Sequence, residues 1–411
     1  MITVTVRPPD RRVRRLAGTL YAYAFLSDLV LLYPVYALLF ADTGLTVWQI
    51  STLFVIWSAS SLLLEVPSGA LADAVSRRLL LCLAPLVTAA GFALWVLVPS
   101  YPTFAVGFLL WGAGGALVSG ALEALVYTGL DQLGAAGRYA RVIGRARTAG
   151  TLGALASIVF AAPVLAFGGY LAVGAASVFA CLLAAAVATR LPDDREPSHP
   201  PRPSAPAPEP DGDDLGWRAS LRAGLAEARA DRAVRRAVLM VGVVAAVWGA
   251  LDEYSPLLAY DTGVAASTVP LLLLFTWLGA AAGGLLAPAG ERLGRRGYAG
   301  LLAGSAVALA VGALVGHPGG FLLVGVAFCG FQLATVLADA RLQARITGPS
   351  RATVTSLAGM ATDVTIIAVY ATYGGLATAT GNGVAFAVAA VPYLVVALLT
   401  ARGRRVPRRD G

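Results

Sequence analysis

The sequence contains no lysine, and all 31 of its basic residues are arginines. A P-loop nucleotide site needs a lysine against the phosphates, and Schiff-base catalysis needs a lysine amine. Both chemistries are therefore excluded. The two histidines, His199 and His317, lie far apart and outside the apolar runs. They give no clustered polar site of the kind that a membrane-embedded enzyme requires, so we expect no enzymatic activity and no cofactor.

Charge is also scarce, at 13% of residues, whereas 58% are hydrophobic. A soluble chain of this length needs more charge to cover its surface. The apolar residues come in blocks of about 20, the length of a helix that crosses a bilayer. We therefore expect an integral protein of the cell membrane that contacts lipid. The net charge of +8 does not indicate nucleic acid, because the arginines lie between apolar runs.

Cysteine is rare as well. Cys82, Cys181 and Cys329 lie far apart, and each lies inside an apolar run. This spacing fits neither a metal site nor a disulfide framework. We expect packing roles for these thiols and no bound metal.

The apolar runs predict an all-α membrane protein with twelve transmembrane helices, six in each half. The predicted spans are 16–40, 47–66, 79–98, 103–130, 142–167, 169–189, 237–260, 267–287, 298–315, 321–340, 354–376 and 384–400.

These spans imply five regions: a tail at 1–15, a six-helix bundle at 16–189, a linker at 190–236, a second bundle at 237–400 and a basic tail at 401–411. The linker begins proline-rich and acidic, a composition typical of disorder. Residues 217–236 follow with apolar residues at helical spacing and arginines on the other face. They predict an amphipathic helix on the membrane surface; an ordinary solvated charged helix is the alternative.

Arginine placement predicts the orientation. If the N-terminus is cytoplasmic, the arginines lie in the inner loops. The outer turns contain none, and they lie at 41–45, 99–102, 168, 261–265, 316–320 and 377–383. This is a positive-inside pattern, and it places both termini in the cytoplasm.

Two motifs occur twice in the chain. Asp73 precedes Arg77-Arg78 as Glu291 precedes Arg295-Arg296, at an offset of 218, and 42–44 (Asp-Thr-Gly) recurs as 261–263 at an offset of 219. Two motifs at nearly one offset indicate an internal repeat, as in many membrane transporters.

With these features the chain resembles the major facilitator superfamily, whose loop after the second helix reads Gly-x-x-x-Asp-x-x-Gly-Arg-Arg/Lys. Gly69, Asp73, Arg77 and Arg78 match this pattern, and Ser76 replaces the inner glycine. The second copy keeps Gly294 but has Glu291 for the aspartate and Ala287 for the leading glycine. The resemblance implies two six-helix bundles related by the repeat and secondary transport of a small molecule by alternating access.

The resemblance also implies a latch at the cytoplasmic face, formed by Asp73, Arg77, Arg78 and Glu123, that joins the halves when the cavity opens outward. Anchoring of the loops at the lipid head groups is the alternative. The candidate residues of this gate are Glu65, Gly69, Asp73, Arg77, Arg78, Glu123, Arg145, Glu291, Arg295, Arg296 and Asp339.

Four acids lie near the middle of predicted spans: Asp28, Asp252, Glu253 and Asp363. A charge at this depth costs at least about 2.5 kcal/mol, so it normally faces a cavity or a partner. No arginine lies at mid-depth to neutralise them. We predict that these acids carry protons or contact substrate, although hydrogen bonds to neighbouring helices are also common in membranes.

Side chains at similar depths are candidates to line a binding cavity, although most such aromatics serve packing or interface anchoring. The candidates are Tyr21, Tyr33, Trp57, Trp111, Trp248, Phe331, Gln332 and Tyr370.

Together the sequence predicts proton-coupled efflux, by antiport, of a small, partly apolar or cationic compound by a monomeric carrier. No mid-membrane arginine is present to hold an anionic substrate. The helix-five signature of exporting antiporters is absent, because Gly150 and Gly153 have no proline near them until Pro163. Proton-coupled uptake of a small solute is the alternative, and a non-transporting sensor on the same scaffold is a third.

Overall fold

The structure is a computed structural model of the 411-residue chain, and it describes residues 9–192, 232–344 and 351–402. Contacts divide the chain into two compact units, one formed mainly by residues 1–204 and the other mainly by residues 205–411. All regular elements in the described residues are helices, which confirms the predicted all-α class. The two units are described separately.

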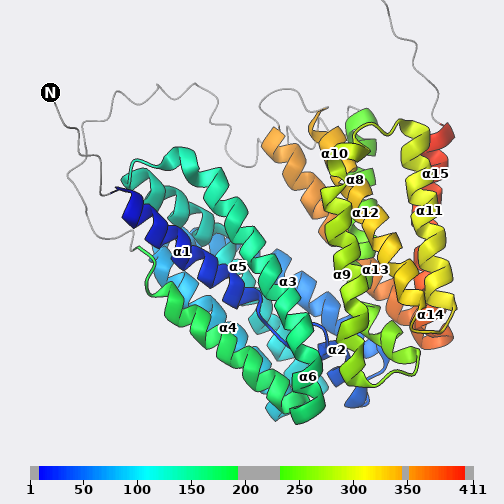
Figure 1. The fold of residues 1–411 in the computed structure, drawn as a ribbon, viewed down its shortest axis with the longest axis horizontal. Helices are drawn as coiled ribbons and strands as arrows, with labels where there is room; N and C mark the ends of the chain where they lie inside the picture. The colour runs from blue at the N-terminus through cyan, green and yellow to red at the C-terminus, as the bar shows by residue number, and fades with distance from the viewer. Residues whose placement is uncertain (1–8, 193–231, 345–350, 403–411) are drawn as a thin grey trace, which may run out of the picture. The chain divides into compact units, whose positions relative to one another are not determined.

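The first unit follows the predicted order of its spans (Figure 1). Its elements are α1 (Pro9–Asp28), α2 (Tyr36–Asp42), α3 (Val47–Ala74), α4 (Arg77–Leu97), α5 (Tyr101–Gln132), the 3-10 turn η1 (Ala136–Arg138) and α6 (Tyr139–Ala188).

The second unit has the corresponding order. Its elements are α8 (Arg232–Asp261), the 3-10 turn η2 (Ala266–Thr268), α9 (Val269–Leu285), α10 (Ala287–Gly290), α11 (Arg295–Leu314), α12 (Gly320–Gln343), α13 (Arg351–Thr380), α14 (Asn382–Ala389) and α15 (Val391–Arg402).

Nine helical segments of the described residues are long and apolar enough to cross a membrane, whereas the sequence predicts twelve. The difference arises at three places. The predicted span 16–40 is divided between α1 and α2, and α6 contains two predicted spans in one segment. The third is α13, which has 30 residues but is not among the nine.

The ends of several helices differ from the predicted boundaries. Helix α1 begins at Pro9, so part of the predicted N-terminal tail is helical, and α8 begins at Arg232 inside the predicted linker. Within α6 the backbone is interrupted at Gly169, whose φ of 61° is accessible to glycine. This is the predicted boundary between the fifth and sixth spans. The predicted amphipathic helix at 217–236 lies mostly outside the described residues.

Polar residues fix where helices begin. Thr46 starts α3 with a capping box, because its hydroxyl accepts from the Gln49 N–H at 3.3 Å while its own N–H donates to Gln49 Oε1 at 2.9 Å. Ser76 caps α4 by accepting from the Leu79 N–H. The polar residues between apolar runs therefore set the register of the membrane helices.

Small residues let the helices approach closely. A Cβ at Gly91 of α4 would meet the carbonyl of Gly107 on α5 at 2.9 Å. In the second unit a Cβ at Gly325 of α12 would meet the Phe275 carbonyl of α9 at 2.5 Å. Packing of small residues drives helix association in membranes, so these contacts fit a protein whose helices lie in lipid.

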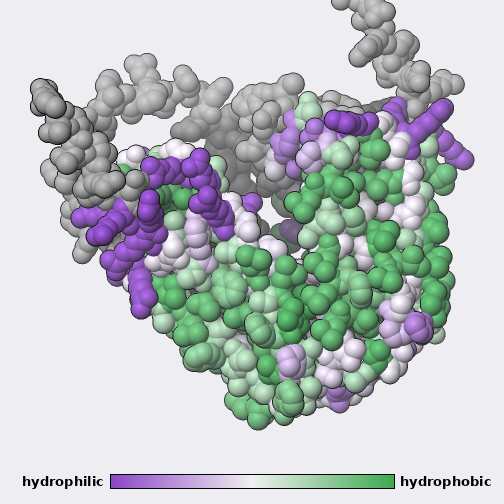
Figure 2. All heavy atoms as spheres, viewed as in Figure 1, coloured by the Kyte–Doolittle hydropathy of each residue, from purple (hydrophilic) through white to green (hydrophobic). Residues whose placement is uncertain are grey.

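The outer surface of each unit is apolar. The most exposed large apolar side chains are Phe167, Leu285 and Leu63, with 93%, 83% and 73% of their surface accessible. Soluble proteins rarely expose so much contiguous apolar surface. On the face shown in Figure 2, hydrophobic residues cover the middle of each unit, and hydrophilic residues gather near the helix ends. This distribution fits a lipid-facing surface.

Candidate functional site

The first helix is broken near the middle of its predicted span. Helix α1 ends at Asp28, and residues 29–35 are not helical before α2 begins at Tyr36. The prediction of one continuous helix over 16–40 was therefore wrong. Pro34 offers no backbone N–H for a helical bond, and the N–H of Leu32 donates instead to Ser177 Oγ of α6, at 3.1 Å.

Asp28 lies at this break, at the last residue of α1. Its side chain is partly exposed, and it has no hydrogen-bond or ion-pair partner among the residues that the structure describes. The carboxylate lies against α6, because a Cβ at Gly150 would overlap Asp28 Oδ2. Glycine at position 150 therefore makes room for this acid between α1 and α6.

Three of the predicted cavity aromatics form a stacked row in the first unit. Tyr33 of the broken segment stacks on Trp111 of α5, with ring centroids 5.2 Å apart and planes 12° apart. Trp111 stacks in turn on Trp57 of α3, at 4.7 Å and 23°. All three side chains are partly exposed. We call Tyr33, Trp57 and Trp111 the aromatic row.

Buried aromatic rings pack against the aromatic row. Tyr36 lies edge-on to Trp111, with centroids 6.1 Å apart and planes at 86°. Phe54, Trp95 and Phe108 also contact Tyr36 and are fully buried. Aromatic pairs of this kind stabilise the fold by about 0.5–1.5 kcal/mol beyond their buried area. These contacts therefore hold Trp111 in place.

Helix α8 of the second unit carries two acids. Asp252 and Glu253 are partly exposed, and neither has a hydrogen-bond or ion-pair partner within the described part of the chain. Tyr370 of the adjacent α13 lies within electrostatic range of both carboxylates. The fourth predicted acid, Asp363, lies on α13, is partly exposed and takes part in an interaction of its own.

Trp248 lies one turn before Asp252 on α8. Its backbone N–H donates to Tyr393 Oη at 2.8 Å, and its indole N–H donates to Thr335 Oγ1 of α12 at 3.1 Å. The Tyr393 hydroxyl donates to the Val244 carbonyl at 3.2 Å. This network fixes the face of α8 on which Trp248 and Asp252 lie.

The remaining cavity candidates lie in different surroundings. Phe331 is fully buried and stacks on Tyr393 at 3.8 Å, and Tyr370 is 3% exposed, so burial gives these two rings packing roles in this conformation. Gln332 is partly exposed and lies beside Gly283 and Gly284 of α9. Tyr21 is partly exposed and packs against the core around α1.

The predicted gate of the first unit is described only in part. The side chains of Glu65 and Asp73 and the surroundings of Gly69 are not described, although the backbone of all three belongs to α3. Arg77 donates to Thr128 Oγ1 of α5 at 3.4 Å, and Arg78 takes part in another interaction.

Glu123 of α5 pairs with a residue outside the predicted gate. It accepts from Arg147 of α6 at 3.2 Å in an exposed ion pair, and Arg145 is exposed nearby in sequence. Exposed pairs of this kind contribute less than about 1 kcal/mol. The latch of Asp73, Arg77, Arg78 and Glu123 stays a prediction.

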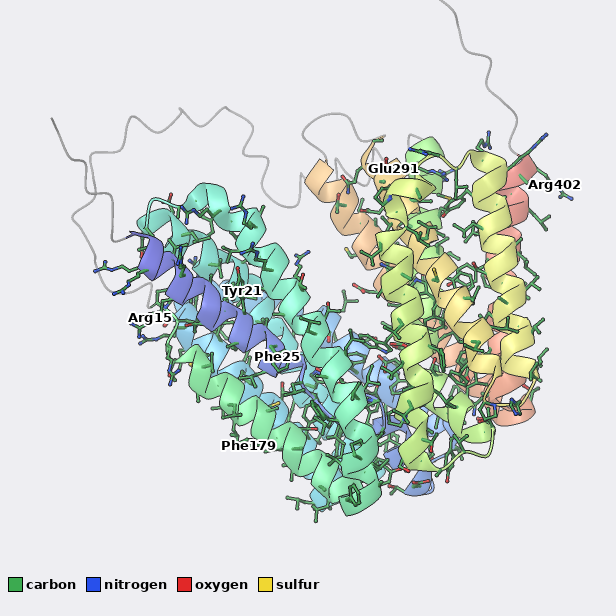
Figure 3. All side chains as sticks on the ribbon, viewed as in Figure 1. Arg15, Tyr21, Phe25, Phe179, Glu291 and Arg402 are labelled. Carbon is green, nitrogen blue, oxygen red and sulfur yellow. The ribbon has the colours of Figure 1, made fainter. Side chains whose placement is uncertain are left out.

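The second copy of the loop is held from α12. Arg341 donates to the Leu293 carbonyl at 3.1 Å, and its guanidinium lies 4.3 Å from the centre of the Tyr298 ring. Glu291, Arg295, Arg296 and Asp339 are exposed. Figure 3 shows Glu291 and Arg402 at the same end of the second unit, opposite α14.

The repeated Asp-Thr-Gly motif forms the same turn in both units. Gly44 and Gly263 have φ of 91° and 83°, which favours glycine. Thr43 and Thr262 each donate from the side chain to a carbonyl of the preceding helical turn, at 2.7 Å in both cases. The predicted repeat is therefore visible in the backbone.

Each turn is also tied to a later helix, a contact that the sequence analysis missed. The Tyr170 hydroxyl donates to Asp42 Oδ2 at 2.7 Å, and Asn382 Nδ2 donates to Asp261 Oδ2 at 2.8 Å. Tyr170 and Asn382 both follow a glycine of positive φ, Gly169 and Gly381. This second glycine pair, at an offset of 212, was the signal that could have revealed them. We call these contacts the paired clasps.

No group of three or more His, Cys, Asp or Glu side chains that could hold a metal is present within residues 9–192, 232–344 and 351–402.

The fold and the site define an all-α membrane protein of two units that share a repeated turn and carry acids inside apolar helices. The sequence matches the model of the Major Facilitator Superfamily over residues 19–345, so the chain belongs to this superfamily. No curated protein matches the sequence significantly.

Solved transporters share the fold at low sequence identity. The nucleoside transporter NupG has a TM-score of 0.74 at 12% identity, covering 95% of this chain and 98% of that chain. A bacterial homologue of the human lysosomal transporter Spinster, inward-facing and unoccupied, has a TM-score of 0.72 at 15% identity, covering 95% and 96%. A D-xylose–proton symporter has a TM-score of 0.61 at 16% identity, covering 95% and 97%. These likenesses show the fold, which is consistent with secondary transport.

Proposed function

We propose that this protein is a proton-coupled secondary transporter that exports a small, partly apolar or cationic compound from the cell by alternating access. The observation that carries the proposal is the set of carboxylates within apolar helices: Asp28 in the first unit, and Asp252 and Glu253 in the second. None has a hydrogen-bond or ion-pair partner in the described residues. A carboxyl group without a cationic partner can alternate between a charged, hydrated state and a protonated one, and this alternation moves a proton.

The distribution of arginine supports a neutral or cationic substrate. In the described spans the arginines lie at helix ends, as in Arg77 at the start of α4 and Arg402 at the end of α15. An anion bound at mid-depth would need a cationic partner there. A cationic or apolar compound needs only the carboxylates and the aromatic faces that the units present.

Proton-coupled uptake is the second candidate, and the similar fold of a D-xylose–proton symporter is the observation that favours it. Its identity of 16% supports the fold and leaves the direction open. A non-transporting sensor on the same scaffold is a third candidate. Antiport and symport respond to opposite proton gradients, which gives a direct test.

The test uses the full chain reconstituted into vesicles with the membrane potential clamped. The probes are ethidium, a permanent cation, and D-xylose, a neutral sugar. Antiport predicts that an acidic interior drives probe accumulation, because protons leave as the probe enters. Symport predicts accumulation only when the exterior is acidic. Absence of gradient-driven movement for either probe in either direction would contradict both and favour the sensor.

The variants assign the coupling residues. We expect Asp28→Asn and Glu253→Gln to lower gradient-driven accumulation at least about tenfold, since each removes a site that can release a proton. Asp131→Asn is the matched control, because Asp131 is exposed at the end of α5; it should retain the parent rate within about twofold. If Asp28→Asn and Glu253→Gln both keep the parent's pH dependence, the coupling role is wrong.

A further inference from the structure

We propose that the aromatic row of Tyr33, Trp57 and Trp111 is a stacking surface for a planar ring of the transported compound. The inference deepens the proposed function, on which it rests, by naming the substrate class: a flat aromatic or heteroaromatic molecule, neutral or singly cationic.

Three separate parts of the chain build the aromatic row. Tyr33 comes from the broken segment 29–35, Trp57 from α3 and Trp111 from α5. The three rings are nevertheless close to parallel, with planes 12° and 23° apart. A continuous first helix would place Tyr33 differently, so the break contributes to this alignment.

The rings of the aromatic row differ from their neighbours in exposure. The three rings of the row are partly exposed, whereas the rings around them, such as Phe54 and Phe108, are fully buried. The second unit has stacks of similar geometry that are buried on both members. Tyr254 on Tyr373 and Phe331 on Tyr393 have centroids 3.8 Å apart, and no member exposes more than 3%. Those stacks are packing, whereas the row keeps accessible ring surface.

The chemistry of the three rings also favours a planar ligand. Indole and phenol faces carry negative potential, so they attract flat, electron-poor rings and cations. Stacking on such faces tolerates many ring types, because every planar heterocycle has a π-face. A cation that carries a planar ring therefore gains from such a face twice, through stacking of its ring and through attraction of its charge.

The experiment measures equilibrium binding to the purified full chain without any gradient. The probes form two pairs matched in charge: ethidium against tetrapropylammonium, and uridine against D-xylose. The first member of each pair contains a planar aromatic or heteroaromatic ring, and the second has none. We expect at least one planar probe to bind at least about tenfold more tightly than its partner, since a stacked ring contributes binding that the partner lacks.

The variants test the row itself. Trp57→Leu should weaken binding of the planar probe about tenfold, and Trp111→Phe, which keeps a ring, should weaken it less than about threefold. Trp48→Leu is the matched control, because Trp48 also lies on α3 and is 47% exposed; it should leave binding unchanged. Thermal unfolding of each variant checks that the fold is retained.

The outcomes separate this inference from the proposed function. Unchanged binding of the planar probe by folded Trp57→Leu, equal binding of both members of each pair, or no binding of either planar probe would overturn the stacking surface. Gradient-driven transport in vesicles would still be measurable in those cases. Conversely, loss of pH dependence would leave the equilibrium preference for planar probes intact.

Discussion

Tyr36 combines a well-packed ring with a buried hydroxyl that has no hydrogen-bond partner in the described residues. Its ring is 2% exposed and contacts Phe40, Phe54, Trp95 and Phe108. A buried polar group without a partner costs about 1–3 kcal/mol, so the hydroxyl oxygen opposes the packing that the ring provides.

We therefore expect Tyr36→Phe to leave the free energy of unfolding unchanged or to raise it by about 1 kcal/mol. Tyr393→Phe is the matched control, because the Tyr393 hydroxyl accepts from the Trp248 N–H and donates to the Val244 carbonyl. That variant should lose about 1–2 kcal/mol. Thermal unfolding in detergent measures both, and an equal loss in the two variants would contradict the prediction.

Single residues were predictable where only depth along the chain mattered. Asp28, Asp252 and Glu253 were recognised as acids inside apolar runs, and none has a hydrogen-bond or ion-pair partner in the described residues. Phe331 and Tyr370 were less predictable. Their exposure depends on which face of α12 and α13 turns inward, and apolar runs with little periodicity do not encode that face.

Among elements, the contact between α1 and α6 leaves no room for an added side chain on α6. A Cβ at Gly153 of α6 would overlap the Phe25 carbonyl of α1, and a backbone atom cannot turn aside as a side chain can. The broken segment follows directly, and Leu32 reaches Ser177 from it. Close approach here therefore positions both Asp28 and Tyr33.

We expect Gly153→Ala to lower the midpoint of thermal unfolding by several degrees, because an added methyl in a tight contact typically costs about 1–3 kcal/mol. Gly144→Ala is the control on the same helix, because a Cβ at that position would meet nothing within 4 Å. It should be neutral or stabilising, since alanine favours a helix by about 1 kcal/mol over glycine. Equal midpoints for the two variants would disprove the tight contact.

The sequence predicted the helical elements well and their interruptions poorly. Blocks of apolar residues located each span, because a helix is the only way for one segment to satisfy its backbone in lipid. The break at 29–35 was missed because its residues are as apolar as a helix requires, and its stabilising bond comes from Ser177, 145 residues away. A local pattern contains no information about that partner.

For the whole molecule, the distribution of arginine predicts an orientation in the membrane that can be tested. Ala265 lies in a predicted outer turn and Arg138 in a predicted inner loop, and both are exposed. We expect Ala265→Cys to react with a membrane-impermeant maleimide on intact cells, because loops without arginine are translocated. Arg138→Cys should react only after permeabilisation. The opposite pattern would place both termini outside.

The internal repeat was predictable at this scale because it rests on short motifs with a strict backbone requirement. Each Asp-Thr-Gly turn needs a glycine of positive φ, so the motif is readable at both sites. The partners in the paired clasps are harder to recognise, because Tyr170 and Asn382 are different residue types that share only a preceding glycine of positive φ and a side chain that donates a hydrogen bond.

The paired clasps also define a spacing that can be searched for in other chains. Asp42 and Tyr170 are 128 positions apart, and Asp261 and Asn382 are 121 apart. The pattern consists of Asp-Thr-Gly and, after this interval, a glycine followed by a residue whose side chain donates a hydrogen bond. It describes one half of the molecule, and it can be recognised in a chain whose overall sequence is not similar.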